Sequence, residues 1–190
     1  MTDIPYAAVI EACWRIAEMR GLDGLTPEAI AVEATVDAPR LRQLFPTRSH
    51  VLRALMHDVF ANANLDAITG SSPRDNLFDL IMAHFDALQA HRAAVVKLYQ
   101  DVVAVRHLDL MLRLRKPYWQ QADGVLVAAG IATDDLLGFG KISLVALLGL
   151  WLLPVWISDE SEDLSKTMAA LDQGLQRLGD INSMVSGFTH

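Results

Sequence analysis

The sequence predicts an all-helical protein, with a small N-terminal helix-turn-helix head followed by a larger helical bundle. Three observations favour helices over sheet. Aliphatic residues and alanine dominate an apolar content of 52%, proline occurs only seven times, and long runs of alternating β-branched residues are absent. With 190 residues and a positive mean hydropathy, the chain can bury a sizeable core.

The first two helices are predicted from apolar spacing and from their end signals. Apolar residues at helical period indicate a helix over Val9–Arg20, and Gly21 is a natural stop. Thr26, Pro27 and Glu28 indicate the start of the next helix. They supply a capping hydroxyl, a proline tolerated in the first turn and an acid at the positive end of the helix dipole.

Two further helices should follow before the chain leaves the head. Asp37 is the expected cap of a short helix that ends at Phe45, before Pro46. Thr47 is the expected cap of a fourth helix that runs to Phe60. Residues 1–50 are therefore predicted to form the head, with a connecting helix over about 47–68 and a body over 69–190.

The second and third helices have the spacing of a helix-turn-helix, with a turn at residues 35–37. In such a unit the second helix lies in the major groove of DNA. Arg40, Arg42 and Gln43 on that helix are residue types that can read guanine and adenine. Arg48, at the start of the next helix, combines a positive charge with free backbone N–H groups and suits a phosphate.

The charge pattern singles out the same segment. The whole chain has a net charge of −7, and residues 1–64, with six arginines and eight acids, have a net charge of −2. Between Ala38 and His57, however, there are four arginines and no acid, so we expect one acid-free basic face. The residues expected to contact DNA are Thr26, Pro39, Arg40, Arg42, Gln43, Thr47 and Arg48.

The body should begin after the turn at residues 69–73, with Ser72 as a cap and Asp75 in the first turn. Helices are expected over residues 73–89, 91–105, 107–129, 134–158 and 162–178. Pro117 should kink or split the third of these, Gly130 should end it, and Ser161 should cap the last.

One body segment, Ile142–Ile157, is almost wholly apolar. At 16 residues it is shorter than the roughly 20 that a membrane-spanning helix needs. We expect a buried helix or a subunit interface there, without stable membrane insertion. Ile181, Met184, Val185 and Phe188 fall on one helical face near the C-terminus, where a packed or frayed tail is favoured over a membrane-touching helix.

Residues 9–56 resemble the DNA-binding domain of TetR-family transcriptional regulators. The resemblance implies a DNA-binding head, a larger ligand-binding and dimerisation body, and repression relieved by a small molecule. The family usually has glycine where this chain has Thr35, and a β-branched residue is awkward at positive φ. The matching positions are Val9–Ala12, Arg20, Gly21, Thr26, Ile30, Ala31, Ala34, Val36, Leu41, Phe45–Arg48, Val51 and Leu52.

The family resemblance and the apolar spacing together indicate two functional surfaces in the body. Two apolar helices per subunit can build the seam of a homodimer, which a helix-turn-helix needs to engage two half-sites of an operator. The expected dimer residues are Leu144, Leu147, Leu148, Trp151, Leu152, Val155, Leu164, Met168, Leu171 and Leu175. The residues expected around a small, apolar and unidentified effector are Met82, Phe85, Tyr99, Met111, Tyr118, Trp119 and Phe139.

A second family of the same fold stays open as an alternative. Lipid-binding proteins of ubiquinone biosynthesis also have a TetR-like fold, and their pattern resembles Leu41-Arg42 with Phe45-Pro46 here. Residues 159–164, followed by Thr167 and Leu171-Asp172, resemble that pattern as well. This interpretation implies a head that does not bind DNA and a body that carries an isoprenoid or another lipid.

No motif in the sequence indicates catalysis. Glycine-rich phosphate loops, nucleophile elbows and dinucleotide fingerprints are absent, and the histidines are spaced too widely for a local metal site. We therefore expect no catalytic residues, no metal and no cofactor. The single cysteine, Cys13, should be buried and inert, and a reducing cytoplasm is the expected compartment.

Overall fold

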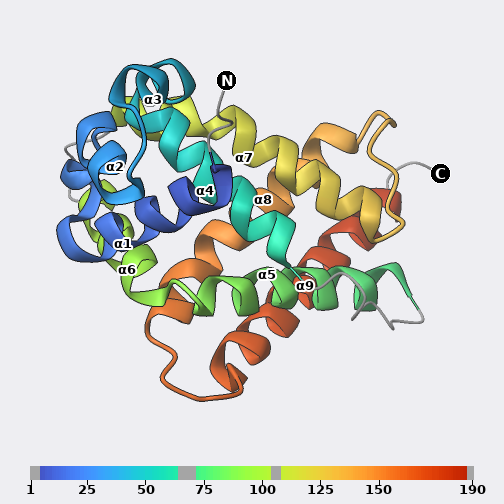
Figure 1. Ribbon diagram of the computed structural model, residues 1–190. Coiled ribbons are helices and arrows are strands. Elements are labelled where there is room, and N and C mark those ends of the chain that lie inside the picture. The colour runs from blue at the N-terminus through green and yellow to red at the C-terminus, as the bar shows by residue number, and fades with distance from the viewer. Residues whose placement is uncertain (1–4, 64–71, 104–107, 188–190) are drawn as a thin grey trace. The chain divides into compact units, whose positions relative to one another are not determined.

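The computed structural model describes residues 5–63, 72–103 and 108–187, and in these ranges the chain is all-helical, as predicted (Figure 1). The short helix predicted after Asp37 ends at Leu44, one residue before the expected Phe45, and the predicted Pro73–Gln89 helix has the expected bounds. The helices are α1 Tyr6–Gly24, α2 Pro27–Ala34, α3 Ala38–Leu44, α4 Arg48–Asn62, α5 Pro73–Gln89, α6 Arg92–Val103, α7 Leu108–Ala128, α8 Gly138–Ile157 and α9 Ser165–Gly187.

The chain divides into two compact units, and the division differs from the predicted boundary at residue 69. The first unit contains residues 1–63 and 86–117, and the second contains residues 64–85 and 118–190. The first unit is larger than the predicted head because α6 packs along α1. Neither the spacing nor the caps of α6 could show this partner, because it lies about 80 residues away in the chain.

The core of the first unit is built around α1. The Trp14 ring stacks on the His91 ring with centroids 4.2 Å apart, and the Trp14 indole N–H donates to Asp58 Oδ2 at 2.9 Å. Gly21 breaks the helix as predicted, with φ of 63°. The Leu22 N–H that follows the break donates to Asp101 Oδ2 on α6 at 2.8 Å.

The helix-turn-helix forms through the expected local signals. Thr26 caps α2 by accepting a hydrogen bond from the Ala29 N–H at 3.2 Å. Thr35 ends α2 in the left-handed conformation, with φ of 55°. Glycine, the residue that the resembled family usually has at this position, adopts this conformation without steric cost. The Val36 N–H then donates to the Ala31 carbonyl at 2.9 Å, so the turn closes as a Schellman motif.

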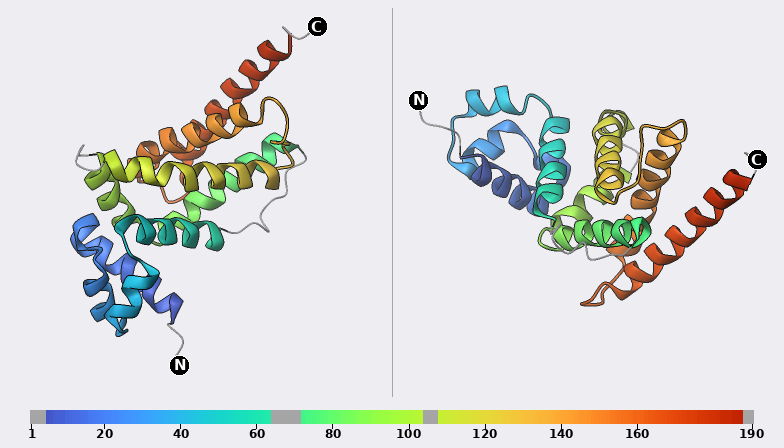
Figure 2. Two further views of the ribbon diagram at one scale, coloured as in Figure 1. Left: turned by 90° about the horizontal axis from the view of Figure 1, so that it is seen from above. Right: turned by 90° about the vertical axis from the view of Figure 1, so that its right-hand side faces the viewer.

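In the second unit, α8 packs against α7 and α9 with glycines at the close approaches (Figure 2). The Tyr118 hydroxyl on α7 lies over Gly149 on α8 and donates to the Ala146 carbonyl at 3.2 Å. Leu148 on α8 fits over Gly174 on α9. A side chain at either glycine would meet these neighbours, so the two positions set how closely the helices pack.

The turn between α8 and α9 is organised by one buried carboxylate, Asp159. Its two oxygens accept hydrogen bonds from the backbone N–H and the hydroxyl of both Ser161 and Thr167. The last helix therefore starts at Ser165 rather than at the predicted residue 162, after Leu164 adopts a left-handed φ of 53°. Ser161 still assists the start, because its hydroxyl accepts from the Ser165 N–H at 3.0 Å.

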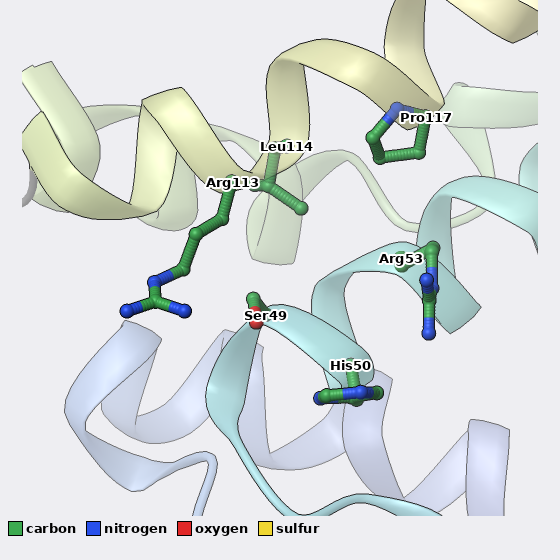
Figure 3. A pocket seen from close by; sticks show the side chains of 6 residues that line it. All are labelled: Ser49, His50, Arg53, Arg113, Leu114 and Pro117. Atoms are coloured by element: carbon green, nitrogen blue, oxygen red, sulfur yellow. The ribbon is translucent and has the colours of Figure 1, made fainter.

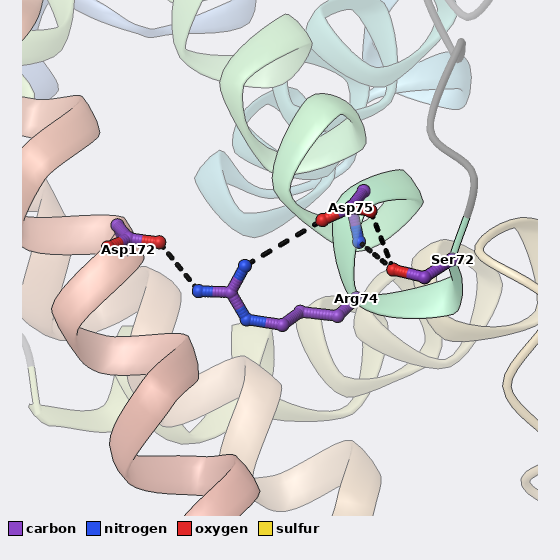
Figure 4. Close-up of polar contacts among 4 residues, drawn as sticks. All are labelled: Ser72, Arg74, Asp75 and Asp172. Atoms are coloured by element: carbon purple, nitrogen blue, oxygen red, sulfur yellow. Dashed lines mark hydrogen bonds and ion pairs between the residues drawn. The ribbon is translucent and has the colours of Figure 1, made fainter.

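The start of α5 confirms the predicted cap and adds an ion pair to α9 (Figure 4). The Ser72 hydroxyl accepts from the Asp75 N–H at 3.2 Å and donates to the Asp75 carboxylate at 2.7 Å. Arg74 projects the other way and donates to Asp172 Oδ1 at 2.6 Å. These contacts fix α5 against α9 within the second unit.

Three body predictions need correction or fall outside the described residues. Pro117 lies inside a continuous α7 and does not split it. The helix predicted from residue 134 begins at Gly138, because Asp135 and Lys141 close a turn before it. The side chains of the predicted apolar tail, residues 181–188, lie outside the described part.

Candidate nucleic-acid interface

Helix α3 has one buried edge and one exposed polar face. Leu41 is fully buried, and Phe45, one turn later, is buried beside it in the core of the first unit. Pro39, Arg42 and Gln43 are spaced by three and four residues and are all exposed. The helix is therefore held on its apolar edge and presents predicted DNA-contact residues to solvent.

The remaining predicted contacts flank this face. Thr26, Arg40 and Arg48 are half-buried, and Thr47 is exposed. Thr47 occupies the N-cap position of α4 without bonding its backbone, because its hydroxyl bonds Ser49 Oγ at 2.7 Å and His50 Nδ1 at 2.8 Å. Asp37 likewise precedes α3 without a side-chain hydrogen bond to its backbone. Both residues therefore occupy the predicted N-cap positions, but neither makes the expected capping hydrogen bond.

The basic face was expected to contain no acid because residues 38–57 contain none, but the fold brings two acids from earlier helices to it. Arg42 Nε pairs with Glu28 Oε1 on α2 at 2.8 Å, and Arg48 Nη1 pairs with Asp23 Oδ1 on α1 at 3.1 Å. The Arg42 hydrogen bond is the main reason that the pKa of Glu28 lies below its ordinary value. Neither acid was predicted at this face, because helix packing brings both from elements that precede α3.

Both ion pairs are open to water. The side chains of Arg42 and Glu28 are 56% and 59% exposed, and those of Arg48 and Asp23 are 40% and 84% exposed. Solvent screening makes exposed ion pairs weak, so these arginines can exchange a carboxylate for a phosphate with little loss. The pairing therefore does not close the face to DNA.

A small hollow on the first unit is lined by two further arginines (Figure 3). It lies between the start of α4 and the middle of α7, and none of its lining residues is acidic. The two guanidinium groups, from Arg53 and Arg113, lie at opposite ends with Ser49 and Leu114 between them. The lining residues are Ser49, His50, Arg53, Arg113, Leu114 and Pro117.

The predicted effector residues do not gather in one of the two units. Tyr99 and Met111 belong to the first unit, and the other five belong to the second. Phe139 and Met111 do not line an enclosed pocket in the protomer, because 74% of Phe139 and 40% of Met111 are exposed. The structure buries Met82 and Phe85 on α5, whereas Tyr118 and Trp119 on α7 are half-buried.

The polar atoms of the second unit include acceptors without a partner among the described residues. Asn76 Oδ1 on α5 and Gln121 Oε1 and Asp123 Oδ1 on α7 are buried and accept no hydrogen bond there. By contrast, the Trp119 indole N–H donates to Ser143 Oγ at 3.2 Å. Buried acceptors of this kind require a donor from water or from a ligand.

The predicted dimer residues separate into two sets. Leu144, Leu147 and Trp151 are exposed on α8, and Val155 and Met168 are half-buried. The others are already buried within the protomer by the packing of α8 and α9: Leu148, Leu152, Leu164, Leu171 and Leu175. The surface that a partner could reach is therefore the outer face of α8, which sequence spacing alone did not separate from the inner face.

This outer face makes α8 unusual. By length and composition α8 could cross a membrane, and only 28% of its most apolar stretch is buried within the described structure. Of the two alternatives expected for this segment, a helix buried inside one subunit does not hold for most of it, and a subunit interface stays a prediction. Its exposed residues, including Leu150 at 46% exposure, form a stripe along the helix.

The fold and the exposed face of α3 define an all-helical protein with a helix-turn-helix in its first third. No protein-family model and no curated protein matches the chain. Solved structures do. A TetR transcriptional regulator from Nitrosomonas europaea has a TM-score of 0.70 and 18% identity, with 92% of this chain and 98% of that chain covered.

Two further solved structures support the same assignment of fold. A TetR transcriptional regulator from Rhodococcus sp. RHA1 has a TM-score of 0.60 and 20% identity, covering 91% of this chain and 96% of that one. The fatty acid degradation regulator FadR from Bacillus halodurans has a TM-score of 0.62 and 16% identity, covering 92% and 96%. The chain therefore has the TetR-like fold that the sequence predicted.

Proposed function

We propose that this protein is a homodimeric, DNA-binding transcriptional regulator that acts as a repressor and releases a palindromic operator when a small effector binds. The observation that carries the proposal is the exposed Arg42 and Gln43 face of α3, anchored from behind by Leu41 and Phe45. An exposed polar face on the second helix of a helix-turn-helix is suited to the major groove.

The outer face of α8 supports dimerisation. Large exposed apolar stripes on a folded chain indicate a binding surface. A second copy of α8 would cover Leu147 and Trp151 in both protomers at once, which is the isologous contact of a two-fold dimer. An operator with two half-sites requires the two heads of such a dimer to bind about 34 Å apart, one turn of the duplex.

The effector acts by differential binding. If the ligand favours a dimer whose heads are spaced wider or narrower than one duplex turn, DNA affinity falls by the ratio of its affinities for the two states. Met82 and Phe85, which are buried in the second unit, remain the proposed lining for an apolar ligand there. The cytoplasm, where such a regulator meets DNA, is the proposed compartment.

No contact among the described residues favours the lipid-carrier alternative. The residues near the C-terminus that resemble the lipid-binding pattern have structural roles. Asp159 and Thr167 bond each other in the α8–α9 turn, Leu171 is fully buried, and Asp172 pairs with Arg74.

The decisive test is selection of genomic DNA fragments by the purified protein at physiological salt. Recovery of one palindromic site supports the proposal, and co-purified isoprenoid without any sequence preference contradicts it. Arg48→Ala should weaken binding to all sequences and lower the salt slope by about 0.9 for each phosphate that a subunit no longer neutralises. Arg40→Ala and Gln43→Ala should instead relax base preference.

The control for these variants is Arg15→Ala. Arg15 lies in the same unit and forms an exposed ion pair with Glu33 at 2.8 Å, yet it is not among the predicted contacts. Its removal should leave operator affinity unchanged. Equal losses in Arg15→Ala and Arg48→Ala would contradict the assigned face.

The dimer is tested separately by analytical ultracentrifugation. Leu147→Glu should produce monomers, because it places a charge in the centre of the apolar stripe. Val127→Glu is the matched control, since Val127 is a similarly exposed apolar residue on α7 in the same unit. A dimer that persists in Leu147→Glu would exclude α8 as the seam.

A further inference from the structure

If the proposed function holds, Asp23 and Glu28 compete with DNA for two arginines: Arg48, which suits a phosphate, and Arg42, whose guanidinium can bind either a phosphate or a base edge. Glu28 Oε1 accepts from Arg42 Nε at 2.8 Å, the side of the guanidinium that a phosphate oxygen would also use. Asp23 Oδ1 accepts from Arg48 Nη1 at 3.1 Å. Two of the predicted DNA-contact arginines are thus already paired with carboxylate oxygens of this chain.

We propose that Asp23 and Glu28 act as internal phosphate mimics, which hold down the affinity of the head for DNA of any sequence. Binding then proceeds by partner exchange, in which each arginine leaves its carboxylate for a phosphate oxygen. The released carboxylates remain beside the DNA backbone and are repelled by it. The proposal rests on the proposed function and adds two affinity-setting residues to it.

The exposure of the pairs makes such exchange possible. A buried ion pair would resist opening, because it would leave an unpaired charge without water. Here water reaches all four side chains, and the most exposed is Asp23 at 84%. The carboxylates therefore compete with phosphate without blocking it.

The two acids are not equivalent. Arg48 also donates from Nη2 to the Asp23 backbone carbonyl at 3.3 Å, a contact that survives when the Asp23 carboxylate is removed. Arg42 has no such backbone contact with Glu28 among the hydrogen bonds described. Neutralising Glu28 should therefore release its arginine more completely than neutralising Asp23.

The chain also contains a matched control. Glu33 lies on the same helix as Glu28 and accepts from Arg15 Nε at the same distance, 2.8 Å. Glu28→Gln and Glu33→Gln remove the same charge from the same short helix. A difference between them reports the local competition at Arg42 and not the total charge of the head.

The experiment measures binding to operator and to unrelated duplex DNA over a range of salt. Glu28→Gln should tighten binding to both DNAs by roughly twofold to fivefold per head, the range expected for an exposed ion pair, and should steepen the salt slope. Asp23→Asn should give a smaller gain, and Glu33→Gln should give none. In an Arg42→Ala background the gain from Glu28→Gln should shrink, because only the repulsion between the Glu28 carboxylate and the DNA backbone is then removed; an undiminished gain would contradict competition at Arg42.

The outcomes distinguish failure of the inference about Asp23 and Glu28 from failure of the proposed DNA binding. Weaker binding by Glu28→Gln would overturn the inference, since it would mean that the acid positions Arg42 for DNA. Equal gains in Glu28→Gln and Glu33→Gln would overturn it as well. If neither the wild type nor the Asp23→Asn/Glu28→Gln double variant binds any DNA at low salt while both stay folded, the proposed function fails.

Discussion

Replacing Asp159 with asparagine should lower the free energy of unfolding by about 3 kcal/mol. Each oxygen of this buried carboxylate accepts two donors: Oδ1 accepts from Ser161, and Oδ2 accepts from Thr167 at 2.7 Å from both N and Oγ1. An amide keeps only one acceptor oxygen and turns an NH₂ group toward two donors. Two hydrogen bonds to a charged group then disappear, each worth about 1.5 kcal/mol.

The pH dependence provides a second signature of the same residue. Burial alone would raise the pKa of Asp159, but the hydrogen bonds from Ser161 and Thr167 outweigh burial and hold the pKa well below its ordinary range. Because the unfolded pKa is about 3.9, this stabilisation is fully present above roughly pH 4 and is lost as the pH falls further. The stability difference between wild type and Asp159→Asn should therefore narrow in acid.

Urea denaturation at pH 7 and at pH 3 measures both effects. Glu160→Gln is the control, since Glu160 is an exposed acid next to Asp159 and should change the stability little. Thr167→Val should cost less than Asp159→Asn, because it removes one hydroxyl bond and leaves the backbone bond. A loss below about 1 kcal/mol, or a loss that does not depend on pH, would refute the reasoning.

The remaining predictions rest on backbone geometry and burial. Thr35→Gly should raise the free energy of unfolding by up to about 1 kcal/mol in a urea titration, because relief of the left-handed strain exceeds the entropy cost of glycine. Leu164→Gly, at the same backbone conformation, should destabilise by about 2 kcal/mol or more, because a buried side chain is removed. Burial raises the pKa of the Cys13 thiol to about 12, so a thiol reagent at pH 8 should label it only after unfolding. Gly138→Ala should lower the thermal midpoint, because its methyl group would collide with the Thr133 carbonyl, whereas Gly140→Ala meets nothing and should raise the midpoint through helix propensity.

Local signals in the sequence were enough for the helix-turn-helix. Thr26 with Pro27 started α2, and Pro46 limited α3, because these effects act within one helical turn. The strained position of Thr35, where the family usually has glycine, was also predictable from the sequence, since only the left-handed conformation closes that turn. Local chemistry could not show that the Thr47 hydroxyl would bond Ser49 and His50 and leave the α4 backbone uncapped.

The partners of the arginines depended on packing. Glu28 and Asp23 reach Arg42 and Arg48 across 14 and 25 residues of sequence, so a scan for acids within the basic strip had to miss them. The same limit applied to α8, where apolar spacing indicated a packed helix but not which side faces its own subunit. Only the positions of α7 and α9 separate Leu148, which is buried, from Leu147, which is 55% exposed.

The sequence by itself determined the fold class, the helix-turn-helix and the residues that α3 presents. These follow from helical period, caps and turn residues, which are interactions between neighbours in the chain. Only the tertiary structure decided which charges meet, which face of α8 is left uncovered, and that α6 joins α1 in the first compact unit. Such contacts join residues that are distant in sequence, and their geometry exists only once the helices have packed.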